Sequence, residues 1–199
     1  DWGKLTYNDR NLTFLDFIKT SIPYCIEHIR NHSKSEQISL HGWSMAGIFV
    51  LLYTALHQPS YIKNLIVLGS PIDSYKSGGI GRLYRKINAY LAYNQKLKHT
   101  LYNGGIPRTF LHTPGIINAI GFKVLDPKGW YDGHKNLLQN LDDQKTLIEH
   151  ATLGHFLNHM IDYPGGVNQD MLFNVWLQNP LKDGKITLGK TIIELNKID

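Results

Sequence analysis

The sequence predicts an α/β fold, in which a partial parallel sheet carries an inserted, mainly helical cap. Residues 37–68 follow the order strand, helix, strand within about 30 residues, the size of a βαβ unit. Residues 74–182 lose this alternation and contain helical patches rich in Tyr and His. Two short runs around a Gly follow within residues 183–199, as is typical of a hairpin. We therefore divide the chain into a core (1–73), a cap or lid insertion (74–182) and a hairpin that returns to the core (183–199).

The first element is a helix. Apolar residues recur at helical spacing over residues 12–30, and Asn11 or Thr13 can cap its N-terminus. Pro23 lies inside this pattern and should kink the helix or split it in two, because proline lacks a backbone N–H. We expect Cys25, in the same helix, to lie in the core, since free Cys is among the most buried residue types.

Two strands and a buried helix come next. Residues 37–42 form a short strand that ends at Gly, and residues 62–68, which are apolar apart from Lys63 and Asn64, are typical of a parallel strand covered on both faces. Residues 45–57 between them are apolar, as expected of a helix packed against a sheet. We expect the strands to be adjacent and parallel, joined by this helix in a right-handed crossover. His41 should pack beneath the turn that follows the first strand.

Gly and Pro positions divide the rest of the chain. They separate the helical patches of the cap at 78–81, 104–107, 114–115 and 163–166. Residues 185–188 and 191–195, on either side of Gly189-Lys190, then predict the two strands of the hairpin.

The junction between the first strand and the buried helix is the candidate site. It consists of Gly42, Trp43, Ser44, Met45, Ala46 and Gly47. This order resembles a nucleophile elbow, a sharp strand-to-helix turn that needs small residues on both sides of an exposed nucleophile. The pattern assigns Ser44 as the nucleophile and the backbone N–H of Met45 to the oxyanion hole. The alternative is an ordinary turn in which Ser44 caps the helix. The βαβ setting favours the elbow, which predicts strained backbone angles at Ser44, in or near the positive-φ region.

Several segments together resemble the central block of the polyhydroxyalkanoate synthases. They are, in order, Asp1-Trp2-Gly3, Asp9-Arg10-Asn11-Leu12-Thr13, the elbow, Tyr53-Thr54-Ala55-Leu56-His57, Ile62-Lys63-Asn64-Leu65 and Ser70-Pro71-Ile72-Asp73. Leu125-Asp126-Pro127, Asp162-Tyr163-Pro164-Gly165 and residues 181–199 look like that family's cap and its return to the core. The resemblance implies an α/β-hydrolase fold and an acyltransferase that acts on 3-hydroxyacyl-CoA.

One departure from that family bears on the chemistry. The synthases carry Cys at the elbow as the nucleophile that accepts the acyl group, whereas this chain has Ser44. Serine is the usual nucleophile of esterases, lipases and thioesterases and depends on a positioned general base. Three functions therefore stay open: a synthase-like acyltransferase, a serine hydrolase of esters, thioesters or polyester, and a non-catalytic relative that binds granules or partner chains. The hydroxyl at an intact elbow argues against the third.

The resemblance also bears on the general base. In this fold the catalytic residues follow the order Ser, Asp, His, and the last two come from loops beyond the cap. The resemblance places this Asp and His beyond residue 199 and predicts that residues 1–199 alone are inactive. The candidates within the chain are His134, His150, His155 and His159. The last two have the i, i+4 spacing of metal ligands, but no Glu of a zinc-protease motif and no Cys cluster accompanies them, so we assign neither a metal nor a cofactor.

Composition narrows the set of partners. The net charge of +5 comes without a nucleic-acid motif, so nucleic acid is not an expected partner. The longest apolar run, 47–56, is far shorter than the roughly 20 residues of a membrane span. The expected ligand is an acyl-CoA or an ester or polyester substrate, and a homodimer or a second synthase subunit are the protein partners considered. The single Cys favours the cytoplasm, and the resemblance adds granule association as an alternative.

Overall fold

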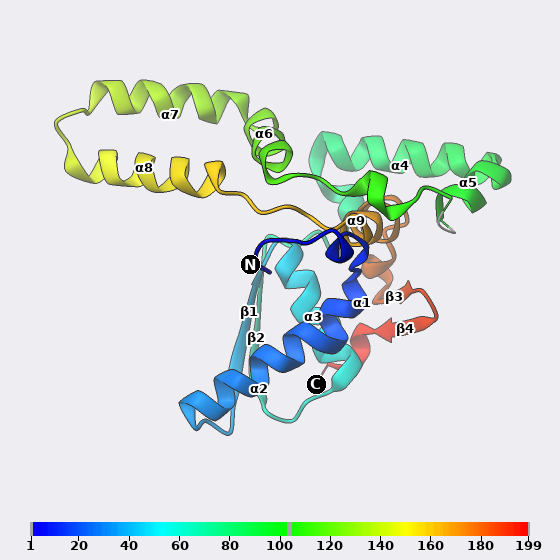
Figure 1. The fold of residues 1–199 in the computed structure, drawn as a ribbon. Helices are drawn as coiled ribbons and strands as arrows, with labels where there is room; N and C mark the ends of the chain where they lie inside the picture. The colour runs from blue at the N-terminus through cyan, green and yellow to red at the C-terminus, as the bar shows by residue number, and fades with distance from the viewer. Residues whose placement is uncertain (1, 103–104, 199) are drawn as a thin grey trace.

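The computed structural model describes residues 2–102 and 105–198 and contains a parallel βαβ unit, whose two strands lie at one edge of the structure (Figure 1). β1 (Ile38–Trp43) pairs in parallel with β2 (Ile62–Leu68), and α3 (Met45–His57) connects them. The prediction of two adjacent parallel strands is confirmed, with the first strand one residue later than expected. Asp1, Gly104 and Asp199, which belong to predicted segments, lie outside the described residues.

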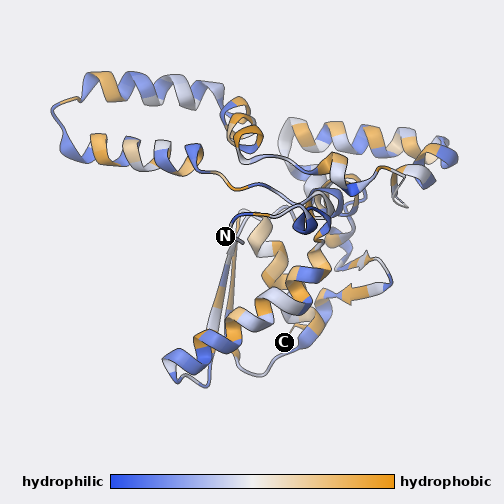
Figure 2. Ribbon diagram, in the orientation of Figure 1, coloured by the Kyte–Doolittle hydropathy of each residue, from blue (hydrophilic) through white to orange (hydrophobic). Residues whose placement is uncertain are grey.

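The helix α3 is the most buried element of this unit. Ile48 and Leu52 are fully buried, and Tyr53 and Ala55 are nearly so. The helix packs against both strands, against the N-terminal helices and against the C-terminal hairpin. Figure 2 shows the resulting hydrophobic colour along α3. A helix that is apolar on nearly all sides is stable in water only when its neighbours cover it in this way.

The N-terminal helix is interrupted, as its proline predicted. α1 (Phe14–Asp16) leads into the π-helical turn η2 (Phe17–Ser21) and then into α2 (Ile22–Ser33), whose second residue is Pro23. A shift in the hydrogen-bond ladder before a proline accommodates its missing N–H. At the start, the N–H and Oγ1 of Thr13 donate to Asp16 Oδ2 at 2.7 and 2.6 Å. These bonds satisfy groups that a helix N-terminus leaves without intrahelical partners.

Three predictions about burial are wrong. β2 is not covered on both faces, since Ile66 is 47% and Leu68 51% exposed. Cys25 is exposed rather than buried, because the residue that α2 turns toward the core is its neighbour Ile26. His41 is exposed rather than packed beneath the turn. In β1 the even-numbered residues, such as Leu40, pack toward the core, and the pleat directs His41 to the opposite face.

A long helical excursion follows β2. It contains α4 (Gly78–Tyr93), α5 (Gln95–Tyr102), α6 (Gly115–Leu125), α7 (Pro127–Gln139) and α8 (Gln144–Asn158). The helical content predicted for residues 74–182 is present, and several of the Gly positions mark helix starts. In Figure 1, α6, α7 and α8 extend away from the sheet, with α7 and α8 side by side. Whether this segment is a separate cap domain stays a prediction.

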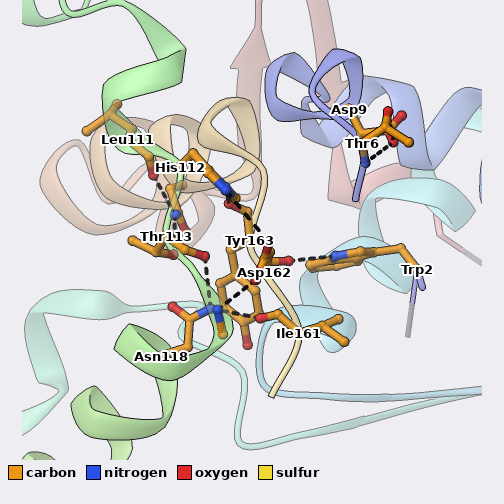
Figure 3. A network of polar contacts seen from close by, with 12 residues as sticks. Trp2, Thr6, Asp9, Leu111, His112, Thr113, Asn118, Ile161, Asp162 and Tyr163 are labelled. Atoms are coloured by element: carbon orange, nitrogen blue, oxygen red, sulfur yellow. Dashed lines mark hydrogen bonds and ion pairs between the residues drawn. The ribbon is translucent and has the colours of Figure 1, made fainter. Parts of the chain in front are cut away.

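A network of polar contacts ties together the two ends of the α6–α8 excursion (Figure 3). Trp2 Nε1 donates to the carbonyl oxygen of Asp162 at 2.9 Å, and the Gly115 N–H donates to Asp162 Oδ1 at 2.8 Å. Thr113 and Tyr163 form an antiparallel backbone bridge beside them. These contacts hold the segment before α6 against the segment after α8. They also hold both segments against Trp2, near the N-terminus.

The chain returns to the core at its C-terminal end. α9 (Gly165–Gln169) continues into the π-helical η5 (Asp170–Leu177), and β3 (Lys185–Leu188) and β4 (Thr191–Glu194) form an antiparallel hairpin. The predicted hairpin is thus present. Ile186, Leu188 and Ile193 are each 1% exposed and belong to the hydrophobic core, although the hairpin forms a sheet of its own.

Short 3₁₀ turns complete the described structure. They are η1 (Asn8–Asn11), η3 (Ser74–Lys76), η4 (Arg108–Leu111), η6 (Pro180–Asp183) and η7 (Leu195–Lys197). Across residues 2–102 and 105–198, no helix has both the length and the apolar character needed to cross a membrane.

Candidate active site

The turn between β1 and α3 holds Ser44 in a strained conformation. Its φ is 56° and its ψ is −121°, which places a non-glycine residue at positive φ, as predicted. Such a conformation costs on the order of 1–3 kcal/mol and persists only where the surroundings enforce it. The Ser44 N–H donates to the Leu68 carbonyl at 2.8 Å, and the Ser44 carbonyl accepts the Gly47 N–H at 3.1 Å. The same carbonyl accepts Ser70 Oγ–H at 2.7 Å.

Small residues make this turn possible. A Cβ on the buried Gly42 would lie 2.5 Å from the carbonyl oxygen of Ala46 and 2.6 Å from the Cα of Gly47, closer than real side chains approach backbone. A Cβ on Gly47 would overlap the Ser70 hydroxyl. Ala46 is exposed, so its methyl group meets no such obstacle. Alanine therefore fits at a position where an elbow usually has glycine.

Ser44 is open to solvent and lies at the N-terminus of α3. Ser44 itself is exposed, and Trp43 beside it is 74% exposed. Met45 opens α3, and the first turn of this helix contains no acidic residue. The N–H groups of a first helical turn have no intrahelical partner and carry partial positive charge, which favours an anion. The role of the Met45 N–H as an oxyanion donor stays a prediction.

A buried polar network fixes the loop that follows β2. The side chain of Asn179 is 1% exposed, its Nδ2 donates to Asp73 Oδ1 at 2.8 Å, and its Oδ1 accepts the Ser74 N–H at 2.8 Å. The hydrogen bond from Asn179 and, to a lesser extent, those from Lys76 and the backbone hold the pKa of Asp73 below its usual value against the opposing effect of desolvation. The loop is thereby fastened to the segment after η5.

Replacing Asn179 by alanine should therefore destabilise the fold by about 2–3 kcal/mol, because Ser74 loses a buried partner and alanine tolerates the left-handed φ of 52° poorly. Asp73 has a lowered folded-state pKa, so its stabilising effect is present above its unfolded pKa and is lost as pH falls through the folded value. The variant should lose less stability than the parent on acidification over that range. Urea unfolding at neutral and acidic pH measures both effects, with the exposed neighbour Gln178→Ala as the control. Equal stability of the two variants would contradict the prediction.

The histidines considered as bases interact with one another. The rings of His134 and His150 lie 5.2 Å apart between α7 and α8, and those of His155 and His159 lie 4.1 Å apart at the end of α8. Among the described residues, no histidine forms a hydrogen bond with the Ser44 hydroxyl. The part of the chain that the structure describes also contains no cluster of three or more His, Cys, Asp or Glu residues that could hold a metal ion.

A separate cavity of about 990 Å³ lies between α5, η5 and the C-terminal hairpin. Its lining includes Lys98, Tyr102, Arg108 and Phe173, and burial raises the pKa of Tyr102 to about 12. Ser44 does not line it. This cavity is therefore distinct from the turn that carries the candidate nucleophile.

The sequence did not reveal the roles of two residues, Ser70 at the turn and Asn179 on the loop that follows β2. Ser70 belongs to a segment that resembles the synthases, and Asn179 belongs to no motif of the sequence. Their partners lie 26 and 105 residues away, respectively, in Ser44 and Ser74. The only local signal for Ser70 is its place directly after the Gly that ends the second strand. Contacts over such separations leave no periodic pattern in a sequence.

Comparison with known proteins adds family evidence. Residues 9–113 match a family model described as the alpha/beta hydrolase fold. The poly(3-hydroxyalkanoate) polymerase subunit PhaC of Haloferax mediterranei is 24% identical to the chain, over all of this chain and 38% of its own length. The same subunit is 24% identical in Synechocystis and 23% identical in Thiocystis violacea, where all of this chain matches 50% and 52% of the relative. The chain thus spans about half or less of these relatives, and the resemblance seen in the sequence is confirmed.

Proposed function

Because the chain belongs to the alpha/beta hydrolase fold family, we propose that its protein is a polyhydroxyalkanoate synthase-like acyltransferase that acts on 3-hydroxyacyl-CoA through an acyl-enzyme at Ser44. The observation that carries this proposal is the position of Ser44. It is exposed at positive φ between the carboxyl end of β1 and the N-terminus of α3. The similarity to polymerase subunits along the whole chain supports acyl transfer as the reaction.

The chemistry follows from this position. Ser44 Oγ would attack the thioester carbonyl, its proton would pass to a general base, and CoA would leave as a thiol after taking up that proton. The negative charge on the carbonyl oxygen would face the Met45 N–H and the positive end of α3. The hydroxyl of a second hydroxyacyl group would then lose its proton to the general base and attack the carbonyl carbon of the acyl-enzyme. The bond from that carbon to Ser44 Oγ would break, Ser44 would take up the proton, and one new ester would join the two hydroxyacyl groups.

A second candidate function is hydrolysis, and the identity of residue 44 favours it. A thiolate reacts with thioesters more readily than a serine hydroxyl, and the synthases carry Cys at this position. Serine is the usual nucleophile of enzymes that pass an acyl group to water. If water reaches the acyl-enzyme, the product is the free hydroxyacid.

The non-catalytic alternative has less support. Backbone strain at Ser44 costs stability, and strained residues cluster at functional sites because function retains them. Ser44 is one of four non-glycine residues at positive φ among the described residues, and it alone sits between a strand and a helix that it directly joins.

The product decides between these functions. The intact gene product would be incubated with a 3-hydroxyacyl-CoA, and the products would be separated and identified by mass spectrometry. We expect CoA release that depends on Ser44, with an ester oligomer or polymer as the product. Free hydroxyacid as the sole product would replace the synthase assignment by the hydrolase. Absence of both CoA release and acylation of Ser44 would favour the binding protein. The dependence on Ser44 would be tested with Ser44→Ala. Its matched control is Ser39→Ala, which removes an exposed hydroxyl elsewhere on the same sheet.

A further inference from the structure

Ser70 lies where the end of β2 meets the start of α3. It is half-buried and follows Gly69, whose φ of 58° turns the chain away from the strand. Its hydroxyl donates to the carbonyl oxygen of Ser44 at 2.7 Å and lies 3.4 Å from that of Leu68. A serine hydroxyl has one proton, and the shorter contact is the stronger hydrogen bond. The main hydrogen bond of the Ser70 side chain is therefore with Ser44, the strained residue.

A second donor reaches the same carbonyl oxygen. The Gly47 N–H donates to the Ser44 carbonyl at 3.1 Å. Any side chain on Gly47 would overlap the Ser70 hydroxyl, so the helix start and Ser70 are in direct contact. On the other side of the residue, the Ser44 N–H is held by Leu68 at 2.8 Å. Both ends of Ser44 are thus anchored to the end of β2.

The anchored carbonyl of Ser44 also determines the direction of the Met45 N–H. The carbonyl of Ser44 and the N–H of Met45 belong to one planar peptide and point in opposite directions. A hydrogen bond that fixes the orientation of the carbonyl therefore fixes the orientation of the Met45 N–H. Donation to the carbonyl also polarises the peptide, which strengthens its N–H as a donor.

We propose that Ser70 is a positioning residue that orients the Ser44–Met45 peptide, so that the Met45 N–H points at the oxyanion formed on Ser44. This role rests on the proposed function, because it requires Ser44 to be the nucleophile. Oxyanion donors act through their orientation before the reaction begins, so a small rotation of this peptide should slow acylation without weakening substrate binding.

The test compares Ser70→Ala, Ser70→Thr and the control Ser39→Ala in the intact gene product. Acylation of Ser44 would be followed with a p-nitrophenyl ester and with the matching thionoester, whose sulfur is a poor hydrogen-bond acceptor. Ser70→Ala should lower kcat about tenfold, or 1.4 kcal/mol in activation free energy, at an unchanged KM. The rate ratio of ester to thionoester should fall as well, because the lost stabilisation acts on an oxygen anion. Ser70→Thr, which keeps the hydroxyl, should restore most of the rate and the ratio.

Two results would overturn the inference while leaving the proposed function in place. One is a Ser70→Ala variant that matches Ser39→Ala in rate and in ester-to-thionoester ratio. The other is a Ser70→Ala variant that slows both substrates equally and melts at a lower temperature, since that pattern describes general loss of structure. A parent protein without acylation at Ser44 would instead refute the proposed function, and the inference would fall with it.

Discussion

Replacing Ser44 by alanine in the intact gene product is expected to lower the rate of CoA release by a factor on the order of 10⁴ to 10⁶, the effect typical of removing a catalytic nucleophile. Alanine has no oxygen to accept the acyl group, so covalent labelling by a serine-reactive phosphonate should also disappear. The rate of CoA release and the extent of covalent labelling can be measured on one preparation, by a thiol assay and by intact-mass spectrometry, respectively. Retained turnover would show that Ser44 is not the nucleophile.

Two further substitutions at this position make the result specific. Ser44→Cys should keep acyl transfer and shift it toward thioesters, because a thiolate attacks them more readily. Ser44→Gly should be inactive yet at least as stable as Ser44→Ala, since only glycine adopts the φ of 56° without strain. A glycine variant less stable than the alanine variant would contradict the strained turn.

Replacing Gly42 by alanine is expected to give the largest loss of stability of the substitutions considered, about 3 kcal/mol or more, together with loss of any Ser44-dependent activity. The added Cβ would lie 2.5 Å from the Ala46 carbonyl oxygen and 2.6 Å from two backbone atoms of Gly47. Backbone cannot move aside as a flexible side chain does, so β1 and α3 would have to separate. Urea unfolding followed by circular dichroism measures the change.

The matched control for this substitution is Gly121→Ala. Gly121 lies inside α6, and a Cβ built on it meets nothing within 4 Å. Alanine is a better helix former than glycine, so this variant should gain up to about 1 kcal/mol. If Gly42→Ala were as stable as Gly121→Ala, the close approach of β1 and α3 at the turn would be refuted.

The features that the sequence alone determined are local ones. The βαβ unit followed from a short strand ending at Gly42, an apolar helix and an apolar strand, and the structure places them at residues 38–43, 45–57 and 62–68. The positive φ of Ser44 followed from small residues spaced around it. The spacing of apolar residues and the steric limits of the backbone involve residues close together in the sequence. The residue order therefore predicts the helix, the strands and the strained turn directly.

The tertiary structure decided the features that depend on distant partners. The exposure of Cys25 and of His41 depends on which face of α2 and of β1 meets the core. The residue type of Cys25 and the place of His41 before the turn both predicted burial, and both predictions were wrong. The hydrogen bond from Ser70 to Ser44 joins residues 26 apart, and that from Ser74 to Asn179 joins residues 105 apart. Such contacts exist only once the chain has packed. For that reason the sequence could identify the candidate nucleophile, whereas only the folded chain shows what holds it in place.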